Sequence, residues 1–459
     1  MTNAYLVGSR VREHQARHMP KIHPISAIQY SVPEDGDISA LIAPPYDVLD
    51  EAGKEWLLRH NPHNIVSIDL PHLPAKTVGP DKTYEAAGAE LQAWLDRGVL
   101  ERSRHARIFV YRQTFTMGGP THERLGLIAN LQIQPFANDP GVTESQIYAH
   151  EQTFSEPKED RLKLTKATRT QLSPIFGIYS DADREISEKL RQVAATSPPA
   201  LRGTTSHDTV RHEIWDAADH IEPLTTILSN KNVYIADGHH RYNTALNYQR
   251  HLIEAQGPLS PDHPANFCMF VLVAMQDPGM VVRPTHRVLG NMDAFEFEAL
   301  TAAAAGHLQI DPFNGDLPAL EAALDSAGDH AFGLCHMSCG RRTLAVATTV
   351  QADPLATSHA GQSEAWRQLD VAILQHLVVE QICEPNFCAA SSHVTWRFPH
   401  ELEALNSWTK SDDFQLGIVM QATPLDAVRR VSEAGELMPQ KSTFFYPKVA
   451  TGFLLNPLS

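Results

Sequence analysis

Val233-Tyr234-Ile235-Ala236-Asp237-Gly238-His239-His240-Arg241, an apolar run that ends in a polar turn, decides the fold prediction for this chain. Its first half is typical of a buried strand, and residues 242–253 have the composition of a helix. Gly238 allows the backbone to turn tightly and to approach a ligand. The start of the helix presents free N–H groups and the positive end of the helix dipole. The stretch therefore predicts a strand, an anion-binding turn and a helix.

The charged residues of the turn favour the same interpretation. His240 and Arg241 can donate charge-assisted hydrogen bonds to an anion, and Asp237 could carry a metal ion or orient a hydroxyl group. The alternative is an ordinary strand-to-helix turn with a capping aspartate and solvated histidines. Two adjacent histidines and an arginine at the end of a strand are unusual for such a turn. We therefore expect the residues from Asp237 to Arg241 to bind phosphate.

The rest of the chain alternates between strand-like and helix-like segments without a strict βαβ rhythm. This pattern predicts an α/β (mixed α+β) protein with a mixed sheet. Strands are expected at residues 65–70, 107–115, 125–136, 173–179, 209–215, 232–236, 267–275, 342–349 and 414–421. Helices are expected at residues 81–97, 181–195, 223–228, 242–253, 294–304, 317–327, 369–382 and 425–434.

The composition indicates a globular protein and excludes several classes. Of the 459 residues, 42% are hydrophobic and 20% are charged, which rules out a disordered chain. The length allows about two to four domains. The formal net charge is −16, so general nucleic-acid binding is not expected, because neutralising phosphates requires clustered basic residues. A local basic pocket for a small phosphorylated ligand is compatible with this charge.

Neither a signal peptide nor a membrane span is expected. Residues 1–17 contain charged side chains but no apolar core. The longest apolar runs, such as residues 267–275, are far shorter than the roughly 20 residues that span a bilayer. Five cysteines are too few for a disulfide scaffold, and Cys335-His336-Met337-Ser338-Cys339 offers at most three zinc ligands, so structural thiols are the expectation. We expect a cytoplasmic protein.

His150, Glu151 and Thr153 form a second polar motif, and Arg161 follows it. The second histidine that a zincin helix requires is missing. A His-Glu pair beside a threonine can nevertheless supply a general base and a group that orients it. The alternative, held equally open, is the polar start of a helix with solvated charges.

Two further loops carry polar side chains that packing does not explain. The proline pair at residues 44–45 could present Tyr46 and Asp47 rigidly. His286 and Arg287 follow a predicted strand. The alternatives are a purely structural proline turn for the first loop and a surface turn for the second.

Lys441-Ser442-Thr443 resembles the end of a phosphate-binding P-loop, but the upstream glycines are absent, which excludes a Walker motif. A lysine and two hydroxyl groups could still contact a phosphate from a loop. The aromatic residues 444–446 give the segment 438–448 enough apolar area to dock against the body of the protein. We expect this segment to return to the phosphate site; the alternative is an edge strand with Lys441 in solvent.

Five blocks of the chain together resemble a bacterial family called domain of unknown function 1015. The blocks occur in this order, and they cover nearly the whole chain: residues 43–48, 150–153, 236–242, 284–287 and 438–448.

The polar turn alone is similar to the phosphate-binding turn of the ParB/sulfiredoxin superfamily, which includes nucleotide-binding partition proteins, sulfiredoxins and free-serine kinases. Gly238, His240 and Arg241 match its phosphate-contacting positions. Asp237 and His239 fit the serine kinases better than the sulfiredoxins, which have a cysteine in the place of His239. The lack of a basic recognition helix disfavours ParB-like DNA binding.

This resemblance implies a division of the chain and a reaction. A ParB/sulfiredoxin-like phosphate-binding core at residues 205–290 would be wrapped by an N-terminal α/β region, residues 1–204, and a C-terminal α/β region, residues 291–459. The reaction would be phosphoryl transfer from ATP or ADP, with Mg²⁺, to a small hydroxyl substrate such as free L-serine. A non-catalytic nucleotide-binding switch and a metal-dependent phosphate-ester hydrolase are the alternatives.

The same resemblance suggests roles for the polar residues. Glu151, or Asp47 in its place, would accept the hydroxyl proton, and Asp237 would help to hold Mg²⁺. The turn would bind the donor phosphates together with His286, Arg287, Lys441, Ser442 and Thr443, and the supporting side chains would be those of Tyr46, His150, Thr153 and Arg161. We expect at least three of five side chains to lie within about 10 Å of Arg241: those of His150, Glu151, Arg161, His286 and Arg287.

Overall fold

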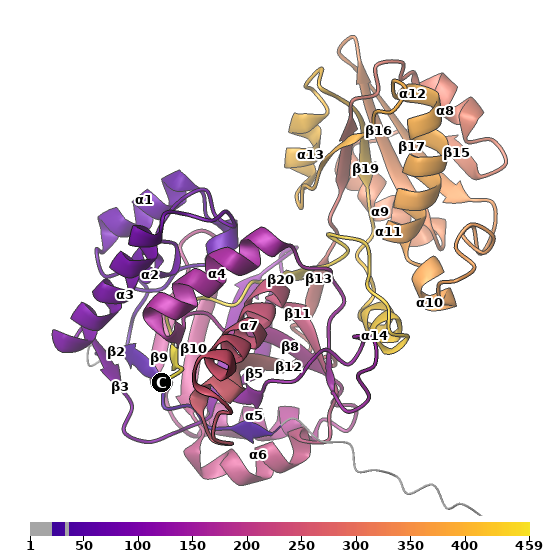
Figure 1. Cartoon of the computed structure of the whole chain (residues 1–459). Helices are drawn as coiled ribbons and strands as arrows, with labels where there is room; N and C mark the ends of the chain where they lie inside the picture. Colours follow the sequence, from indigo (N-terminus) through magenta and orange to yellow (C-terminus); the bar gives the residue numbers. More distant parts are fainter. Residues whose placement is uncertain (1–20, 33–35) are drawn as a thin grey trace, which may run out of the picture.

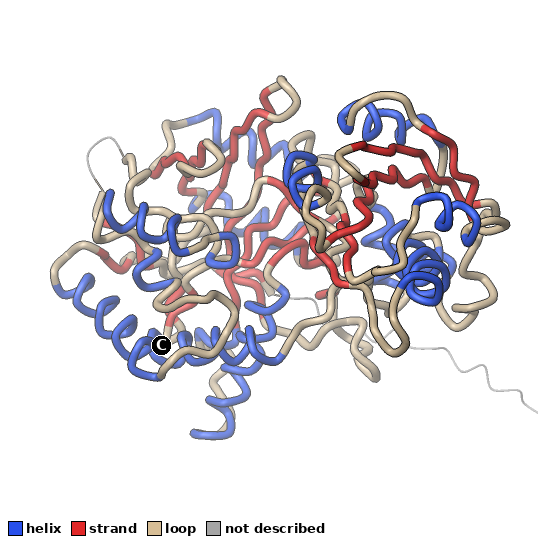
Figure 2. The backbone as a smooth tube through the Cα atoms, turned by 90° about the horizontal axis from the view of Figure 1, so that it is seen from above, coloured by secondary structure: helices blue, strands red, loops and turns tan. Residues whose placement is uncertain are grey.

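The structure, a computed structural model, describes residues 21–32 and 36–459, and these form two lobes (Figure 1). The larger lobe holds a nine-stranded sheet, and the smaller lobe, drawn in salmon and orange, holds a six-stranded sheet. Seen from above, strands lie within both lobes with helices around them (Figure 2). The predicted mixed α/β class is confirmed.

The large sheet has the strand order β6-β11-β8-β12-β5-β4-β10-β9, and β1 pairs with β5. The pairs β8–β12 and β6–β11 are parallel and the other pairs are antiparallel, so the sheet is mixed. The boundary expected between residues 204 and 205 falls between β9 and β10, which pair with each other. The strands are β1 (Ile22–His23), β4 (Phe109–Thr116), β5 (Thr121–Gln132), β6 (Ile147–Tyr148), β8 (Ile175–Tyr179), β9 (Leu201–Thr204), β10 (Arg211–Asp216), β11 (Val233–Asp237) and β12 (Phe267–Ala274).

Apolar side chains cover both faces of this sheet. Along β12, Val271 and Val273 belong to the apolar cluster on one face, while Phe270 and Leu272 belong to the cluster on the other, as the two-residue period of a strand requires. Helices α3 (Asp81–Asp96) and α4 (Ser155–Thr168) contribute to the first cluster, and α5 (Glu185–Thr196) and α6 (Ile221–Leu228) contribute to the second. The smaller N-terminal elements are β2 (Ile28–Tyr30), α1 (Glu51–His60), α2 (Val66–Asp69), β3 (Leu100–Arg102) and the 3₁₀ turn Tyr46–Val48.

The strand predicted for residues 65–70 is wrong, because this segment forms the short helix α2. Asn64 starts the helix: its side-chain oxygen accepts the N–H of Val66 at 3.0 Å, and its amide group donates to two carbonyls of a preceding loop. A short apolar run has no period that separates a buried strand from a buried helix.

The smaller lobe is an antiparallel sheet in the order β15-β17-β16-β19-β14-β18. Its strands are β14 (Arg287–Gly290), β15 (Leu308–Pro312), β16 (Ala331–Ser338), β17 (Arg341–Thr349), β18 (Thr395–Arg397) and β19 (Phe414–Val419). The helical segments from residue 297 to residue 433 are α8 (Phe297–Ala303), α9 (Leu317–Ala327), α10 (Glu364–Arg367), α11 (Asp370–Ile373), a π-helical stretch (Leu374–Cys383), α12 (Glu384–Phe387), α13 (Leu402–Trp408) and α14 (Leu425–Glu433).

The end of the chain returns to the larger lobe. β20 (Phe444–Tyr446) pairs with β13 (Val281–Arg283) near the junction of the lobes. After β20, Thr451 pairs with Ala43, and β21 (Asn456–Pro457) pairs with β7 (Thr170–Gln171). Within the described part of the chain, none of the helices is both long enough and apolar enough to cross a membrane.

Arg124 of β5 ties the large sheet to this returning segment. It is almost fully buried, and its guanidinium donates to the side-chain oxygen of Gln113 and to the carbonyls of Tyr446 and Pro447. Arg124→Leu would leave these buried acceptors without a donor, at about 1–3 kcal/mol for each. For the three acceptors together, we therefore expect urea denaturation to show a loss of at least about 3 kcal/mol in the free energy of unfolding. Arg59→Leu, at an exposed arginine of α1, is the control, and an equally small effect at both positions would contradict the prediction.

Candidate functional site

The polar turn has the local structure that the sequence predicts. β11 ends at Asp237, Gly238 makes the turn, and α7 (His239–Gln256) begins at the next residue. Gly238 has a φ of 97°, in the left-handed region that favours glycine. A Cβ atom at this position would lie 3.1 Å from the guanidinium group of Arg241. The backbone conformation therefore favours glycine here, and a larger residue would also require the guanidinium of Arg241 to shift slightly.

Asp237 is held between two cations. Its Oδ2 accepts a hydrogen bond from Nη2 of Arg241 at 2.5 Å, and its Oδ1 accepts one from Nζ of Lys448 at 2.6 Å. Burial alone would raise the pKa of the Asp237 carboxyl, but the charges of Lys448 and Arg241 outweigh it and hold the pKa well below its ordinary value. We call these three side chains the charged cluster. Two cations and one carboxylate leave one positive charge near the first turn of α7, where the helix dipole also favours an anion.

Residues 438–448, called the strap from here on, bring Lys448 to the turn. At the start of the strap, the N–H of Met438 donates to the carbonyl of His150 at 2.8 Å. In its middle, Phe445 is fully buried, with its ring centroid 6.3 Å from that of His150. The strap therefore lies along the larger lobe and reaches the charged cluster through its last residue.

His150 connects β11 with the strap. Its Nδ1 lies 2.9 Å from the carbonyl oxygen of Ile235, so Nδ1 carries a proton and donates it. Its Nε2 lies 2.9 Å from Oγ1 of Thr443. Burial lowers the pKa of His150, so the ring is neutral near pH 7 and Nε2 accepts the hydroxyl proton of Thr443.

His239, the first residue of α7, lies beside His150 and Glu151. Its Nε2 accepts the backbone N–H of His150 at 3.3 Å, which leaves the proton on Nδ1, 4.0 Å from a carboxylate oxygen of Glu151. Burial and the neighbouring His150 lower the pKa of His239 far below its ordinary value. Side chains predicted from two separate motifs are thus in contact.

The Tyr46-Asp47 loop adjoins the same region. The guanidinium of Arg161 lies 4.0 Å from the ring centre of Tyr46. Burial raises the pKa of Tyr46, although the nearby charges of Arg161 and Arg241 oppose this. Asp47 lies 3.5 Å from the ammonium group of Lys76. Asp47 Oδ1 and Arg161 Nη2 are both buried without a hydrogen-bond partner among the described residues.

His240 faces the loop that follows Glu151. Its Nε2 accepts the N–H of Phe154 at 3.1 Å, and burial lowers its pKa while the charge of Glu151 opposes the shift. Glu151 and Thr153 line a cavity of about 290 Å³ that also touches Arg250 of α7. Open volume that a small molecule could enter therefore lies next to Glu151.

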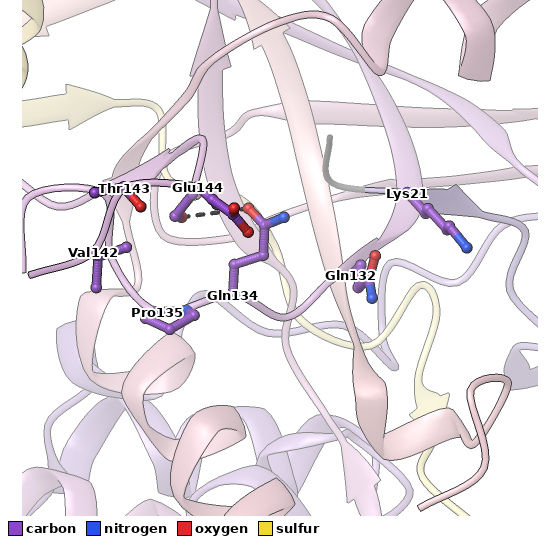
Figure 3. A pocket seen from close by; sticks show the side chains of 8 residues that line it. Lys21, Gln132, Gln134, Pro135, Val142, Thr143 and Glu144 are labelled. Atoms are coloured by element: carbon purple, nitrogen blue, oxygen red, sulfur yellow. Dashed lines mark hydrogen bonds between the residues drawn. The ribbon is translucent and has the colours of Figure 1, made fainter. Parts of the chain in front are cut away.

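A larger cavity lies at the end of β5 (Figure 3). It has a volume of about 540 Å³ and is lined by residues that include Lys21, Gln132, Gln134 and Glu144. In the part of the chain that the structure describes, its lining contains none of the residues that the sequence singled out.

His286 and Arg287 make their contacts at the start of the smaller lobe. His286 Nδ1 accepts the backbone N–H that follows β19 at 3.1 Å, and Arg287 donates to the carbonyl of Lys441 at 3.0 Å. The hydroxyl of Ser442 donates to the carbonyl of Pro439 within the strap. Arg287 and Ser442 thus hold the strap in place, and a direct role in phosphate binding for these residues and for exposed Lys441 stays a prediction.

Sequence reasoning missed Lys76 and gave Lys448 no partner. Lys448 lies 211 positions from its partner Asp237. Lys76 pairs with Asp47 from a loop that carries no motif. Lys448 stands close to the Lys441-Ser442-Thr443 motif and within the family block of residues 438–448, but neither signal indicates its partner.

Two cationic side chains would compete with Mg²⁺ for the carboxylate oxygens of Asp237. Both carboxylate oxygens of Asp237 already accept hydrogen bonds from cations. Across residues 21–32 and 36–459, no group of three His, Cys, Asp or Glu side chains could hold a metal ion. Mg²⁺ commonly uses one or two carboxylates together with substrate phosphates. Asp47 is another carboxylate near the turn, with Oδ1 unpartnered among the described residues and Oδ2 3.5 Å from the ammonium group of Lys76. The role of Asp237 as a metal ligand stays a prediction.

The family model described as Protein of unknown function (DUF1015) matches residues 22–372. The chain belongs to this family. The predicted resemblance to this family is thereby confirmed. The match includes four of the five sequence blocks and ends before the fifth, residues 438–448. No curated protein matches the chain.

The solved structures that are similar to this chain include a free serine kinase mutant in complex with AMP. It has 10% sequence identity and a TM-score of 0.31, and the match covers 65% of this chain and 84% of that one. SbnI with a C-terminal truncation, from Staphylococcus aureus, has 10% identity and a TM-score of 0.32, covering 68% and 84%. A conserved hypothetical protein from Pyrococcus furiosus has 14% identity and a TM-score of 0.30, covering 66% and 89%.

Asp237→Asn tests the charged cluster through its pH dependence. Because the folded pKa of Asp237 is depressed, the ionised carboxylate stabilises the fold fully above its unfolded pKa and loses this effect as the pH falls through the folded pKa. We expect the melting temperature of the wild type to exceed that of Asp237→Asn by a constant margin from about pH 8 to about pH 5, and the margin to shrink below about pH 4.

The control is Asp183→Asn, at an exposed position before α5, which should show no such margin. The ion pairs of the charged cluster would be contradicted if the difference in melting temperature between the wild type and Asp237→Asn stayed constant down to about pH 2.5, or if it were absent at neutral pH.

Proposed function

We propose that this protein transfers a phosphoryl group from a nucleotide, ATP or ADP, to a small hydroxyl substrate, with free L-serine as the first candidate. The observation that carries the proposal is the charged cluster at the start of α7, where Arg241 and Lys448 flank Asp237 beside Gly238. Phosphoryl transfer depends mainly on positioning and on neutralising phosphate oxygens. A glycine turn, a helix N-terminus and two fixed cations supply both requirements.

The donor phosphates would bind over the turn. The lysine ammonium has three N–H donors, and Asp237 accepts one from Lys448. Helix α7 is 18 residues long, and the unpaired N–H groups of its first turn point toward the same region. Asp237 would keep Arg241 and Lys448 apart and oriented, so that little side-chain entropy is lost when the nucleotide binds.

Glu151 is the favoured acceptor of the substrate proton. Its carboxylate is partly exposed, lines the 290 Å³ cavity and lies 4.0 Å from Nδ1 of His239. A general base must be within hydrogen-bond reach of the proton that it takes, and a substrate hydroxyl in this cavity would meet that condition. Asp47 is the reserve, and its unpartnered oxygen would also suit a nucleotide-bound Mg²⁺.

One assay separates the candidate functions. Purified protein is incubated with ATP or ADP and a panel of amino acids that includes L-serine, and the products are followed by ³¹P NMR and mass spectrometry. A kinase gives a phosphorylated acceptor. A nucleotide-binding switch binds the nucleotide without turnover, and a hydrolase releases phosphate without any acceptor; either result would replace the proposed function.

Arg241→Ala tests the phosphate-binding role of the turn. Loss of a charged hydrogen bond should weaken nucleotide binding by about 1.5–3 kcal/mol, roughly 10- to 150-fold in Kd, as measured by calorimetry. Arg59→Ala, at an exposed arginine of α1, should leave the affinity unchanged. Unchanged affinity in a folded Arg241→Ala variant would refute nucleotide binding at this turn.

A further inference from the structure

We infer that Thr443 is itself a phosphoryl acceptor: its hydroxyl attacks the terminal phosphate of the bound nucleotide while His150 takes the proton, and the product is a phosphothreonine. This inference rests on the proposed function and adds a covalent step to the same site. The evidence for it is a chain of two hydrogen bonds that joins a nucleophile, a base and an orienting group. These are Thr443 Oγ1, the His150 ring and the carbonyl of Ile235.

The His150 ring is fixed in the orientation that a general base needs. Its Nδ1 donates to the carbonyl of Ile235 at 2.9 Å, which turns the lone pair of Nε2 toward Oγ1 of Thr443, also at 2.9 Å. Only 2% of His150 is exposed, so water does not compete for this lone pair. A hydroxyl within hydrogen-bond reach of a base that a third group orients is the arrangement by which proteins activate serine and threonine.

The position of Thr443 on the strap distinguishes it from its neighbour. The hydroxyl of Ser442 is buried and donates to the carbonyl of Pro439, whereas Thr443 is half-buried and donates to a side chain that can accept its proton. His150 bonds to Ile235 of β11, two residues before Asp237, and its ring centroid lies 4.6 Å from that of His239, the first residue of α7. A phosphate bound over the start of α7 would therefore lie near the Thr443–His150 pair.

The step balances in atoms and charge. A bond forms between Oγ1 of Thr443 and the terminal phosphorus, and the bond from that phosphorus to its bridging oxygen breaks. The nucleotide leaves with one phosphate fewer, and the proton passes from Oγ1 to Nε2 of His150. The nucleotide is the sole co-reactant.

The test is labelling of the full-length protein with [γ-³²P]ATP or [β-³²P]ADP, followed by peptide mass spectrometry. We expect one phosphate on Thr443 in the wild type, none in Thr443→Val, and retained labelling in Thr443→Ser. His150→Asn, whose amide can still donate to the carbonyl of Ile235, should slow labelling by about 100-fold or more, the size of a general-base contribution. Thr121→Val, at an exposed threonine of β5, is the matched control and should label as the wild type does.

Calorimetry with the same nucleotides separates this inference from the proposed function. Thr443→Val should still bind nucleotide, because Arg241 and Lys448 are intact, and should melt within a few degrees of the wild type, so that the loss of label reflects the missing hydroxyl and not unfolding or a lost nucleotide site. A wild type that binds nucleotide and phosphorylates a free acceptor, but carries no label at Thr443, would overturn the inference alone. Equal labelling of Thr443→Val would also overturn it, and absence of nucleotide binding in the wild type would overturn both proposals.

Discussion

The ion pairs of Asp237 with Arg241 and Lys448 are the interaction on which the rest of the site depends. A buried carboxylate is unfavourable unless cations and hydrogen bonds compensate for its lost hydration. Arg241 belongs to the same turn as Asp237, but Lys448 lies 211 positions further along the chain. The polar turn therefore adopts the conformation seen in the structure only when the strap is packed against it. The strap in turn is held at the turn by the ion pair of Lys448 with Asp237.

The strap also couples the two lobes. On the side of the larger lobe, Arg124 donates to two strap carbonyls and His150 bonds to Thr443. On the side of the smaller lobe, Arg287, the first residue of β14, donates to the carbonyl of Lys441. A displacement of the smaller lobe would consequently pull on Lys448 and on Thr443. The smaller lobe is thus placed to set the geometry of the site without supplying the turn itself.

The parts of the site that were predictable are those fixed by neighbouring residues. An apolar strand, a glycine at positive φ and a helix start are local features, and the sequence from Val233 to Arg241 shows all three. The strand predicted for residues 65–70 is wrong because the helix there depends on Asn64, whose side chain bonds to a distant loop as well as to the helix start. The pairing of Asp237 with Lys448 could not be predicted, since a charge on one segment does not identify its partner on another.

The most direct measurement is a crystal structure of the wild-type protein with ADP. We expect the terminal phosphate to lie over the start of α7, with its oxygens about 2.7–3.2 Å from donors of Arg241, Lys448 and the backbone N–H groups of the first turn. A nucleotide bound elsewhere, for example in the cavity beside Gln134, with the charged cluster unoccupied and unchanged, would contradict it.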